Sequence, residues 1–131
     1  MTELNWLIDL GFTMRELRGL PRNTLLLLTD QYEQFALEHN MKLVLQYFDR
    51  QNVLQFLVRY PMSFAKNTDT FWRRLNEVIL RLGEKEWRQI LLDQFSKCPD
   101  DCIIGAIGAN DEYIWECALD RLDLFQDGIW I

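Results

Sequence analysis

Apolar residues recur every three or four positions along almost the whole chain, and this helical period constrains the fold more than any other feature. The segment that begins at Thr68 or Asp69 shows the period most clearly, because its apolar side chains form one stripe and its charged side chains lie outside it. We expect a helix here that Gly83 ends. The stripe consists of Phe71, Trp72, Leu75, Val78, Ile79 and Leu82, and the residues outside it are Arg73, Arg74, Glu77 and Arg81.

Capping signals predict further helix ends. Thr13 and Glu16 have the spacing of a capping box, in which each side chain bonds the backbone amide of the other residue. Gly11 is expected to end the first helix in a left-handed conformation. Asp100-Asp101 offers a cap for a short turn, and Asn110-Asp111 offers one for the last helix. In that last helix we expect Ile114, Trp115, Ala118, Leu122 and Phe125 to face inward.

Residues 41–60 are the ambiguous segment, because their apolar side chains are too dense to show a single period. The polar residues 49–52 could separate two strands of a hairpin or two buried helices. Helices are favoured, since both neighbouring regions have a helical period and an isolated two-stranded ribbon is only marginally stable. The helix before this segment is expected to run from residue 23 or 24 to about His39.

The length and composition are sufficient for one hydrophobic core. The chain has 131 residues, of which 49% are apolar, and no linker rich in Ser, Pro or Gly divides it. The sequence therefore predicts an all-α fold: a compact single domain over residues 1–131 with about seven short helices. A small β-hairpin within residues 41–60 is the alternative for that segment.

The sequence also argues against a membrane protein and against a secreted one. The longest apolar run is the four leucines of residues 25–28, whereas a membrane span needs about 20 apolar residues. No basic region precedes an apolar stretch at the N-terminus, so no secretory signal is expected. Three cysteines are an odd number in a chain that can build its own core, which favours reduced thiols and a cytoplasmic location.

No cofactor, metal site or catalytic group is predicted. Cys98, Cys102, Cys117 and His39 are together the minimum for a structural zinc site, but the spacing of Cys98 and Cys102 is not that of a C-x-x-C pair. The only histidine is His39, and no pair of carboxylates lies in an apolar segment that would raise a pKa. These observations favour a non-enzymatic protein, with a hydrolytic enzyme that uses scattered carboxylates as a less favoured alternative.

Acidic residues are concentrated near the end of the chain. Residues 100–127 carry eight acidic side chains and one arginine, so their net charge is −7, against −6 for the whole chain. Five of the acids follow one another at spacings of four, four, three and four, which places them on one face of a helix. They are Glu112, Glu116, Asp120, Asp123 and Asp127.

This acidic row has two interpretations. It is either a solvated face that keeps the protein soluble or a surface that binds a basic partner. Like charges at this spacing repel by about 0.2–0.5 kcal/mol per pair, and the neighbouring residues in sequence supply almost no cations to relieve that repulsion. A basic partner would relieve it and would associate faster through electrostatic steering. A regular row of carboxylates could also imitate a nucleic-acid backbone, so a nucleic-acid-handling protein is one plausible partner.

A basic stripe supplies the alternative site. Arg74, Arg81, Lys85 and Arg88 would share one face if their helix were continuous, with Arg73 beside them. Such a stripe could hold the phosphates of a nucleic acid, although ion pairs at i, i+4 between Glu77 and Arg81 and between Glu84 and Arg88 would also explain it. The net charge of −6 argues against direct nucleic-acid binding by the whole molecule, since phosphate contacts are cationic.

The sequence ends on an apolar tail, Ile129-Trp130-Ile131. The tail either docks on its own domain or anchors a partner, and tryptophan is a preferred residue at the centre of protein interfaces. The sequence thus favours a protein-binding regulator, of the inhibitor, immunity or adaptor type, with Trp130 and the acidic row as candidate partner-binding residues. A small nucleic-acid-binding module that uses the basic stripe is the alternative.

Overall fold

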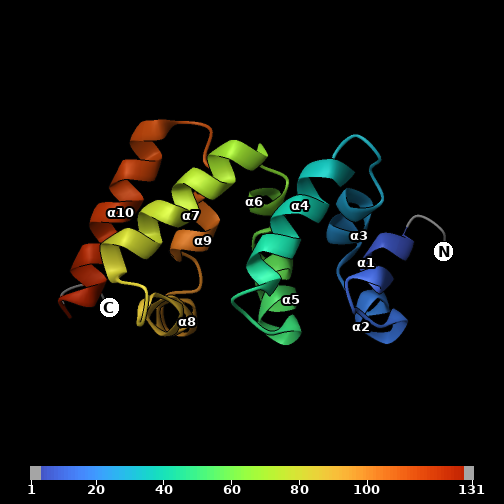
Figure 1. Cartoon of the computed structure of the whole chain (residues 1–131), viewed down its shortest axis with the longest axis horizontal. Helices are drawn as coiled ribbons and strands as arrows, with labels where there is room; N and C mark the ends of the chain where they lie inside the picture. Colours follow the sequence, from blue (N-terminus) through green and yellow to red (C-terminus); the bar gives the residue numbers. More distant parts are fainter. Residues whose placement is uncertain (1–3, 129–131) are drawn as a thin grey trace. The chain divides into compact units, whose positions relative to one another are not determined.

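The structure is a computed structural model that describes residues 4–128, and within them it contains ten helices and no strand (Figure 1). The all-α prediction is confirmed, with more helices than the predicted seven. The contacts within the chain form two compact units, Met1–Thr68 and Asp69–Ile131. The prediction of one domain over residues 1–131 stays a prediction. None of the helices in residues 4–128 is both long and apolar enough to cross a bilayer.

Short helices with well-defined caps build the first unit. Thr13 Oγ1 accepts a hydrogen bond of 3.1 Å from the amide of Glu16, and Glu16 Oε1 accepts one of 2.9 Å from the amide of Thr13, as the capping box predicts. Gly11 has φ +106°, a left-handed conformation that other residues rarely adopt, and it follows the first helix as expected. The helices are α1 (Asn5–Asp9), α2 (Met14–Arg18), α3 (Arg22–Leu28), α4 (Gln34–Leu45), α5 (Arg50–Arg59) and α6 (Pro61–Phe64).

The single helix predicted from residue 23 to His39 is wrong, because the chain breaks between α3 and α4. The Thr29 hydroxyl donates to the carbonyl oxygens of Leu25 and Leu26 at 3.0 and 3.1 Å, and Asp30 Oδ1 accepts a bond of 2.9 Å from the amide of Tyr32. Short polar side chains of this kind compete with the helical backbone for hydrogen bonds. The second helix then continues beyond His39 to Leu45.

Residues 41–60 are helical, so the hairpin alternative is wrong. Their polar run contains the cap of α5: Asp49 Oδ1 accepts a hydrogen bond of 2.8 Å from the amide of Asn52. Helices α4, α5 and α6 pack against one another. The buried side chain of Asn40 fastens α4 to the end of α6, because its Nδ2 donates to the carbonyl oxygens of Phe64 and Lys66 at 2.9 and 2.8 Å. The core of this unit includes Leu7, Phe12, Leu17, Leu28, Leu37, Met41, Val44, Val53, Phe56, Leu57 and Phe64.

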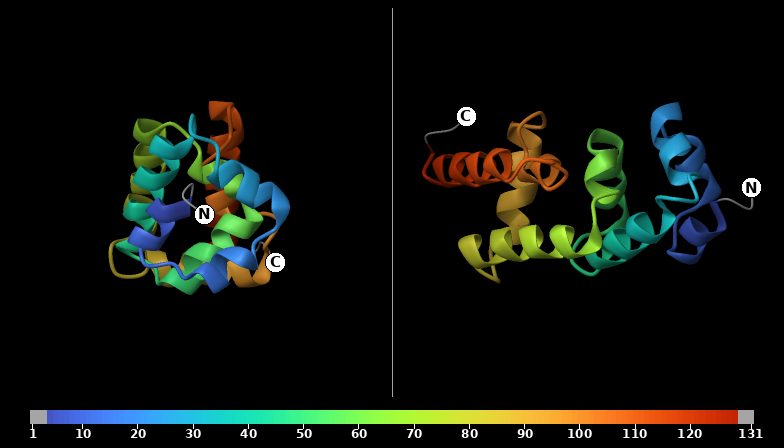
Figure 2. Two further views of the ribbon diagram at one scale, coloured as in Figure 1. Left: turned by 90° about the vertical axis from the view of Figure 1, so that its right-hand side faces the viewer. Right: turned by 90° about the horizontal axis from the view of Figure 1, so that it is seen from above.

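Four helices form the second unit, and α7 and α10 are its two long ones (Figure 2). The short α9 packs against both α8 and α10. Gly83 follows α7 with φ +93° and ends it as predicted. The four helices are α7 (Thr68–Leu82), α8 (Trp87–Lys97), α9 (Ile103–Ala106) and α10 (Glu112–Gln126).

The predicted stripe of α7 is partly wrong. Trp72 was expected inside and Arg74 outside, but Trp72 is 44% exposed and Arg74 is only 2% exposed. The apolar residues at i, i+4, i+7 and i+11 set the buried line, and successive residues of a helix are rotated by about 100° from one another. Trp72 and Arg74 lie at opposite margins of this line, about 90° and about 70° from its centre. Arg74 is the buried one because its margin faces the loop before α10, to whose carbonyl oxygens it donates. The buried residues of α7 are Phe71, Arg74, Leu75, Val78 and Leu82.

The predicted acidic cap of the short turn is also wrong. Cys102 occupies the N-cap position of α9 and makes no side-chain cap bond. Instead Gln94, buried on α8, accepts a hydrogen bond of 2.9 Å from the amide of Ile103 through its Oε1. Ile103 is itself buried, so a neutral amide satisfies this backbone group at a lower desolvation cost than a carboxylate would.

Candidate functional site

Helix α10 carries most of the predicted acidic row, and its buried side sets where that row points. Asp111 caps the helix, because its Oδ1 accepts a hydrogen bond of 2.8 Å from the amide of Tyr113. Ile114, which was expected to face inward, is 51% exposed, since it lies one residue before Trp115 and is rotated away from the buried line. Phe125 is half-buried. The buried residues of α10 are Trp115, Ala118, Leu119 and Leu122.

The five predicted carboxylates lie to one side of this buried line, about 110° from it around the helix axis. Glu112, Glu116, Asp120 and Asp123 belong to α10, and Asp127 is its C-cap residue. With about 100° of rotation per residue, the five positions fall within an arc of about 80°. Asp123 is half-buried and the other four are exposed. The row is therefore one continuous edge of the helix, as its spacing predicts.

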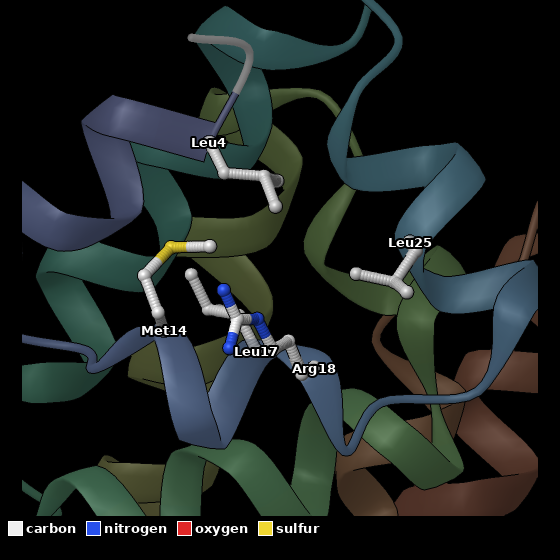
Figure 3. Close-up of a pocket in the computed structure, with 5 residues that line it drawn as sticks. All are labelled: Leu4, Met14, Leu17, Arg18 and Leu25. Atoms are coloured by element: carbon white, nitrogen blue, oxygen red, sulfur yellow. The ribbon is translucent and has the colours of Figure 1, made fainter. Parts of the chain in front are cut away.

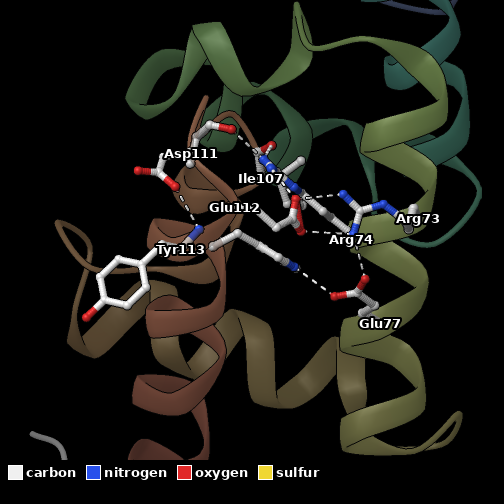
Figure 4. Close-up of polar contacts among 9 residues, drawn as sticks. Arg73, Arg74, Glu77, Ile107, Asp111, Glu112 and Tyr113 are labelled. Carbon is white, nitrogen blue, oxygen red and sulfur yellow. Dashed lines mark hydrogen bonds and ion pairs between the residues drawn. The ribbon is translucent and has the colours of Figure 1, made fainter.

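Two arginines of α7 hold the first carboxylate of the row. Arg73 donates to both oxygens of Glu112, with Nη1–Oε1 and Nη2–Oε2 distances of 3.0 and 2.9 Å, and Arg74 Nη2 donates to Oε2 at 3.1 Å (Figure 4). The hydrogen bonds from Arg73, and next those from Arg74, lower the pKa of Glu112 to about 2. The bonds to Glu112 in turn raise the pKa of Arg73. Glu112 is thus the acceptor of a bidentate pair of the kind that binds most strongly.

A second ion pair holds Asp123. Arg81 Nη1 lies 2.8 Å from Asp123 Oδ2, about three helical turns along α10 from Glu112. The neighbouring residues in sequence supply almost no cations to the row, but the folded unit brings cations to two of its carboxylates. The cations come from α7, which is distant in sequence and lies beside α10 in this unit (Figure 4).

Arg74 is the centre of the contact between α7 and the start of α10. Its Nη1 donates to the carbonyl oxygens of Ile107 and Ala109 at 2.8 and 2.6 Å, and its guanidinium lies 5.4 Å from the ring centroid of Trp115. Trp115 Nε1 donates to Glu77 Oε2 at 2.8 Å. A buried guanidinium is tolerated when its charge and donors find partners, so this arginine has a structural role.

These pairings change the interpretation of the basic stripe. Arg73, Arg74 and Arg81 bond carboxylates and carbonyls of their own unit, and only Lys85 and Arg88 lie beyond α7. A single basic face required a continuous helix, and the helix is not continuous, because α7 ends at Leu82 and α8 begins at Trp87. The predicted pair of Glu77 with Arg81 is wrong, since Glu77 bonds Arg73 and Trp115 instead.

The remaining three carboxylates are different. Within residues 4–128, Glu116, Asp120 and Asp127 form no ion pair. They share their side of α10 with Tyr113, which is 71% exposed, and Leu124, which is 39% exposed. We call these five residues the outer stripe; along the chain they are separated by three, four, four and three positions. Tyr113 and Leu124 were not among the predicted site residues, although their helical spacing from the acids was a signal in the sequence.

The other sulfur and aromatic candidates are dispersed. Cys98 and Cys117 are half-buried free thiols, and burial raises the pKa of the Cys102 thiol to about 12. A side-chain hydrogen bond with Cys117 raises the pKa of Tyr113. In the described part of the chain, no three His, Cys, Asp or Glu side chains gather where they could hold a metal ion. Trp130 and its tail, Ile129-Trp130-Ile131, lie outside the described residues.

Comparison with known proteins assigns this chain to no group: no family model, no curated protein and no solved structure matches it.

Proposed function

We propose that this chain is a non-enzymatic protein-binding regulator of the inhibitor, immunity or adaptor type, and that it binds a basic surface of a partner through the outer stripe of α10. One observation carries the proposal. Within a single row of five carboxylates, α7 neutralises Glu112 and Asp123, and three carboxylates have no cation in residues 4–128. The unneutralised charge is thus confined to one side of the helix.

The electrostatic cost of this arrangement favours a partner. Glu116 and Asp120 are four residues apart, and like charges at that spacing destabilise a helix by about 0.2–0.5 kcal/mol. Lysine or arginine side chains of a partner would remove this repulsion. They would also be attracted over about 8 Å at physiological ionic strength, which speeds association more than it strengthens the final complex.

A protein interface needs apolar contacts as well as complementary charge, and the outer stripe contains two residues that can provide them. Tyr113 and Leu124 are exposed beside the carboxylates, and an interface needs apolar or aromatic groups that can be desolvated between its charged contacts. From Tyr113 to Asp127 the stripe extends over about 21 Å at 1.5 Å per residue. This length and spacing suit a helix that lies in a groove of its partner.

The partner we favour is a nucleic-acid-handling protein in the cytoplasm, because its nucleic-acid-binding surface is basic and would accept a row of carboxylates in place of phosphates. Direct nucleic-acid binding by this chain is the weaker candidate. Three of the five cations that it would use, Arg73, Arg74 and Arg81, already bond acceptors within their own unit.

The test compares two variants that remove the same charge from different places. The first carries Glu116→Gln, Asp120→Asn and Asp127→Asn, and the matched control carries Glu84→Gln, Glu86→Gln and Asp101→Asn, three exposed carboxylates outside α10. A partner is captured from native lysate at low salt with the unmodified chain, and its association rate with each variant is then measured at several salt concentrations.

We expect the first variant to associate about tenfold more slowly at low salt, with a flatter salt dependence, while the control behaves like the unmodified chain. Circular dichroism should show the same helix content in all three proteins. An unchanged rate and salt slope in the first variant would remove the outer stripe from consideration. Salt-dependent binding of isolated DNA or RNA would instead support the nucleic-acid-binding candidate.

A further inference from the structure

The first unit contains a cavity of about 280 Å³ near the start of α1 and between α2 and α3 (Figure 3). Four of its lining residues are apolar: Leu4, Met14, Leu17 and Leu25. The fifth is Arg18, which is the only charged residue among the described residues of the lining. Cavities that bind small molecules are mostly apolar and have a few polar groups that fix the orientation of the ligand.

The lining has a buried floor and a more open rim. Leu4 and Leu17 are each 1% exposed, whereas Met14 and Leu25 are half-buried and Arg18 is exposed. Figure 3 shows the guanidinium of Arg18 beside the side chains of Met14 and Leu17, with Leu25 on the other side of the opening. The cationic group therefore lies where an apolar interior meets solvent.

The charge around this opening is uncompensated. Arg15, Arg18 and Arg22 are all exposed, and within residues 4–128 no carboxylate forms an ion pair with any of them. The nearest acid in sequence, Glu16, is already engaged: it accepts hydrogen bonds of 3.0 Å from Arg50 Nε and 2.7 Å from Gln51 Nε2. Among residues 4–128 no carboxylate lines the cavity, so an anionic group there would meet no competing acid from the described part of the chain.

We propose that this cavity binds a small aliphatic carboxylate. The aliphatic chain would lie among Leu4, Leu17 and the rim leucine and methionine, and the carboxylate would accept paired hydrogen bonds from the planar guanidinium of Arg18. The cavity lies at the lower end of the ~300–1,000 Å³ typical of ligand sites, which suits a single aliphatic chain rather than a nucleotide or another multi-ring cofactor. The same chemistry is offered by a free fatty acid and by the C-terminal leucine of a peptide.

The first experiment titrates the full chain with octanoate, octanol and acetate, and follows binding by calorimetry and by backbone amide shifts in NMR spectra. Octanoate should bind at one site and shift the amides of α2 and α3. Octanol, which lacks the charge, and acetate, which lacks the chain, should bind at least about tenfold more weakly. An acetylated Gly-Gly-Leu peptide with a free or an amidated C-terminus then distinguishes the two sources, because only a peptide-binding site prefers the free peptide to octanoate.

Variants separate the role of the guanidinium from that of the cavity. Arg18→Gln should weaken octanoate binding at least about tenfold and leave octanol unchanged, whereas Arg15→Gln, outside the lining, should change neither by more than about twofold. Leu25→Trp, which fills a half-buried position of the rim, should weaken both ligands. Circular dichroism checks that each variant is folded.

Three results would overturn the proposal. One is octanoate binding of equal strength in Arg18→Gln and the unmodified chain. Another is a set of shifted amides that lies outside the lining residues. The third is an absence of saturable binding by both octanoate and the free peptide below about 10 mM, which is tenfold weaker than a millimolar site.

Discussion

One set of arginines in each unit shows an opposite use of the same side chain. In the first unit Arg15, Arg18 and Arg22 are exposed and pair with no carboxylate of the described residues. In the second unit Arg73, Arg74 and Arg81 all bond groups of α9, α10 or the loop between them. The difference lies in the helix that faces them, because only the second unit folds an acidic helix beside its arginines. A cluster of arginines in a sequence therefore does not by itself predict a binding surface.

The two units also differ in the buried polar side chain that fastens their helices together. The first unit fastens α6 to α4 with the neutral amide of Asn40, which donates to two carbonyls. The second unit fastens the loop before α10 to α7 with the charged guanidinium of Arg74, which donates to two carbonyls and a carboxylate. A buried charge costs more to desolvate than a neutral amide does. Arg74 also has more hydrogen-bond partners than Asn40, so its substitution leaves more unsatisfied groups behind.

The largest effect should come from the buried tryptophan beside Arg74. Trp115→Ala should lower the free energy of unfolding by about 3–5 kcal/mol, because it empties a fully buried site. Trp72→Ala is the matched control, since Trp72 is 44% exposed, and it should cost less than about 1 kcal/mol. Chemical denaturation followed by circular dichroism measures both. Similar losses for the two tryptophans would contradict the orientation of α7 described above.

Arg74→Met should have the next largest effect, a loss of about 2–4 kcal/mol, because it leaves the carbonyls of Ile107 and Ala109 without donors. Arg73→Met is its control: Arg73 is exposed and its ion pairs are screened by water, so we expect a loss below about 1 kcal/mol. The two variants thus separate the effect of the buried charge of Arg74 on stability from that of the exposed charge of Arg73. An equal loss in both variants would mean that Arg74 acts only through Glu112.

Much of this fold could be predicted from local sequence, because helical period and capping act over a few residues. The capping box of Thr13 and Glu16 and the break at Gly83 follow from short-range hydrogen bonds and backbone conformation. The acidic row also follows from spacing alone, since five positions at intervals of three and four must share one edge of a helix.

The partners of that row could not be predicted in the same way. Glu112 and Asp123 are paired by arginines that lie 38 to 42 residues earlier, so no local pattern identifies the pairs. The wrong prediction that Trp72 is buried and Arg74 is exposed has a related cause. Both lie at the margins of the apolar stripe, and the carbonyls that attract Arg74 belong to a distant loop. The division of the row into neutralised and outer carboxylates therefore needed the tertiary structure.

In the first unit, Asn40→Ala should cost about 1–3 kcal/mol, less than Arg74→Met in the second, because a neutral donor is lost from two carbonyls. Gln55→Ala, which removes an exposed amide from α5, is the control and should have almost no effect. Hydrogen exchange measured on the peptide that contains residues 61–66 should become faster only in Asn40→Ala. Unchanged exchange there would show that Asn40 does not hold α6 to α4.

The smallest effect concerns the pH dependence of the pair between Glu112 and the two arginines. The pKa of Glu112 is lowered from 4.5 to about 2 in the folded chain, chiefly by hydrogen bonds from Arg73 and then from Arg74. A lowered pKa means that the folded state holds the proton less tightly than the unfolded state does, so the carboxylate stabilises the fold above pH 4.5. That contribution is lost as the pH falls from 4.5 toward 2. Its size is limited because Glu112 is exposed and water screens the pair.

The measurement compares the unmodified chain with Glu112→Gln by chemical denaturation at a series of pH values. The unmodified chain should be the more stable of the two at neutral pH, and the difference should shrink between pH 4.5 and about pH 2. Arg73→Gln removes the donor that lowers the pKa of Glu112 most. In a protein that carries Arg73→Gln, the stability lost through Glu112→Gln should therefore be smaller at every pH above 4.5. A difference that stays constant down to pH 2 would show that the arginines of α7 do not neutralise Glu112. The contrast between neutralised and outer carboxylates, on which the proposed interface depends, would then lose its basis.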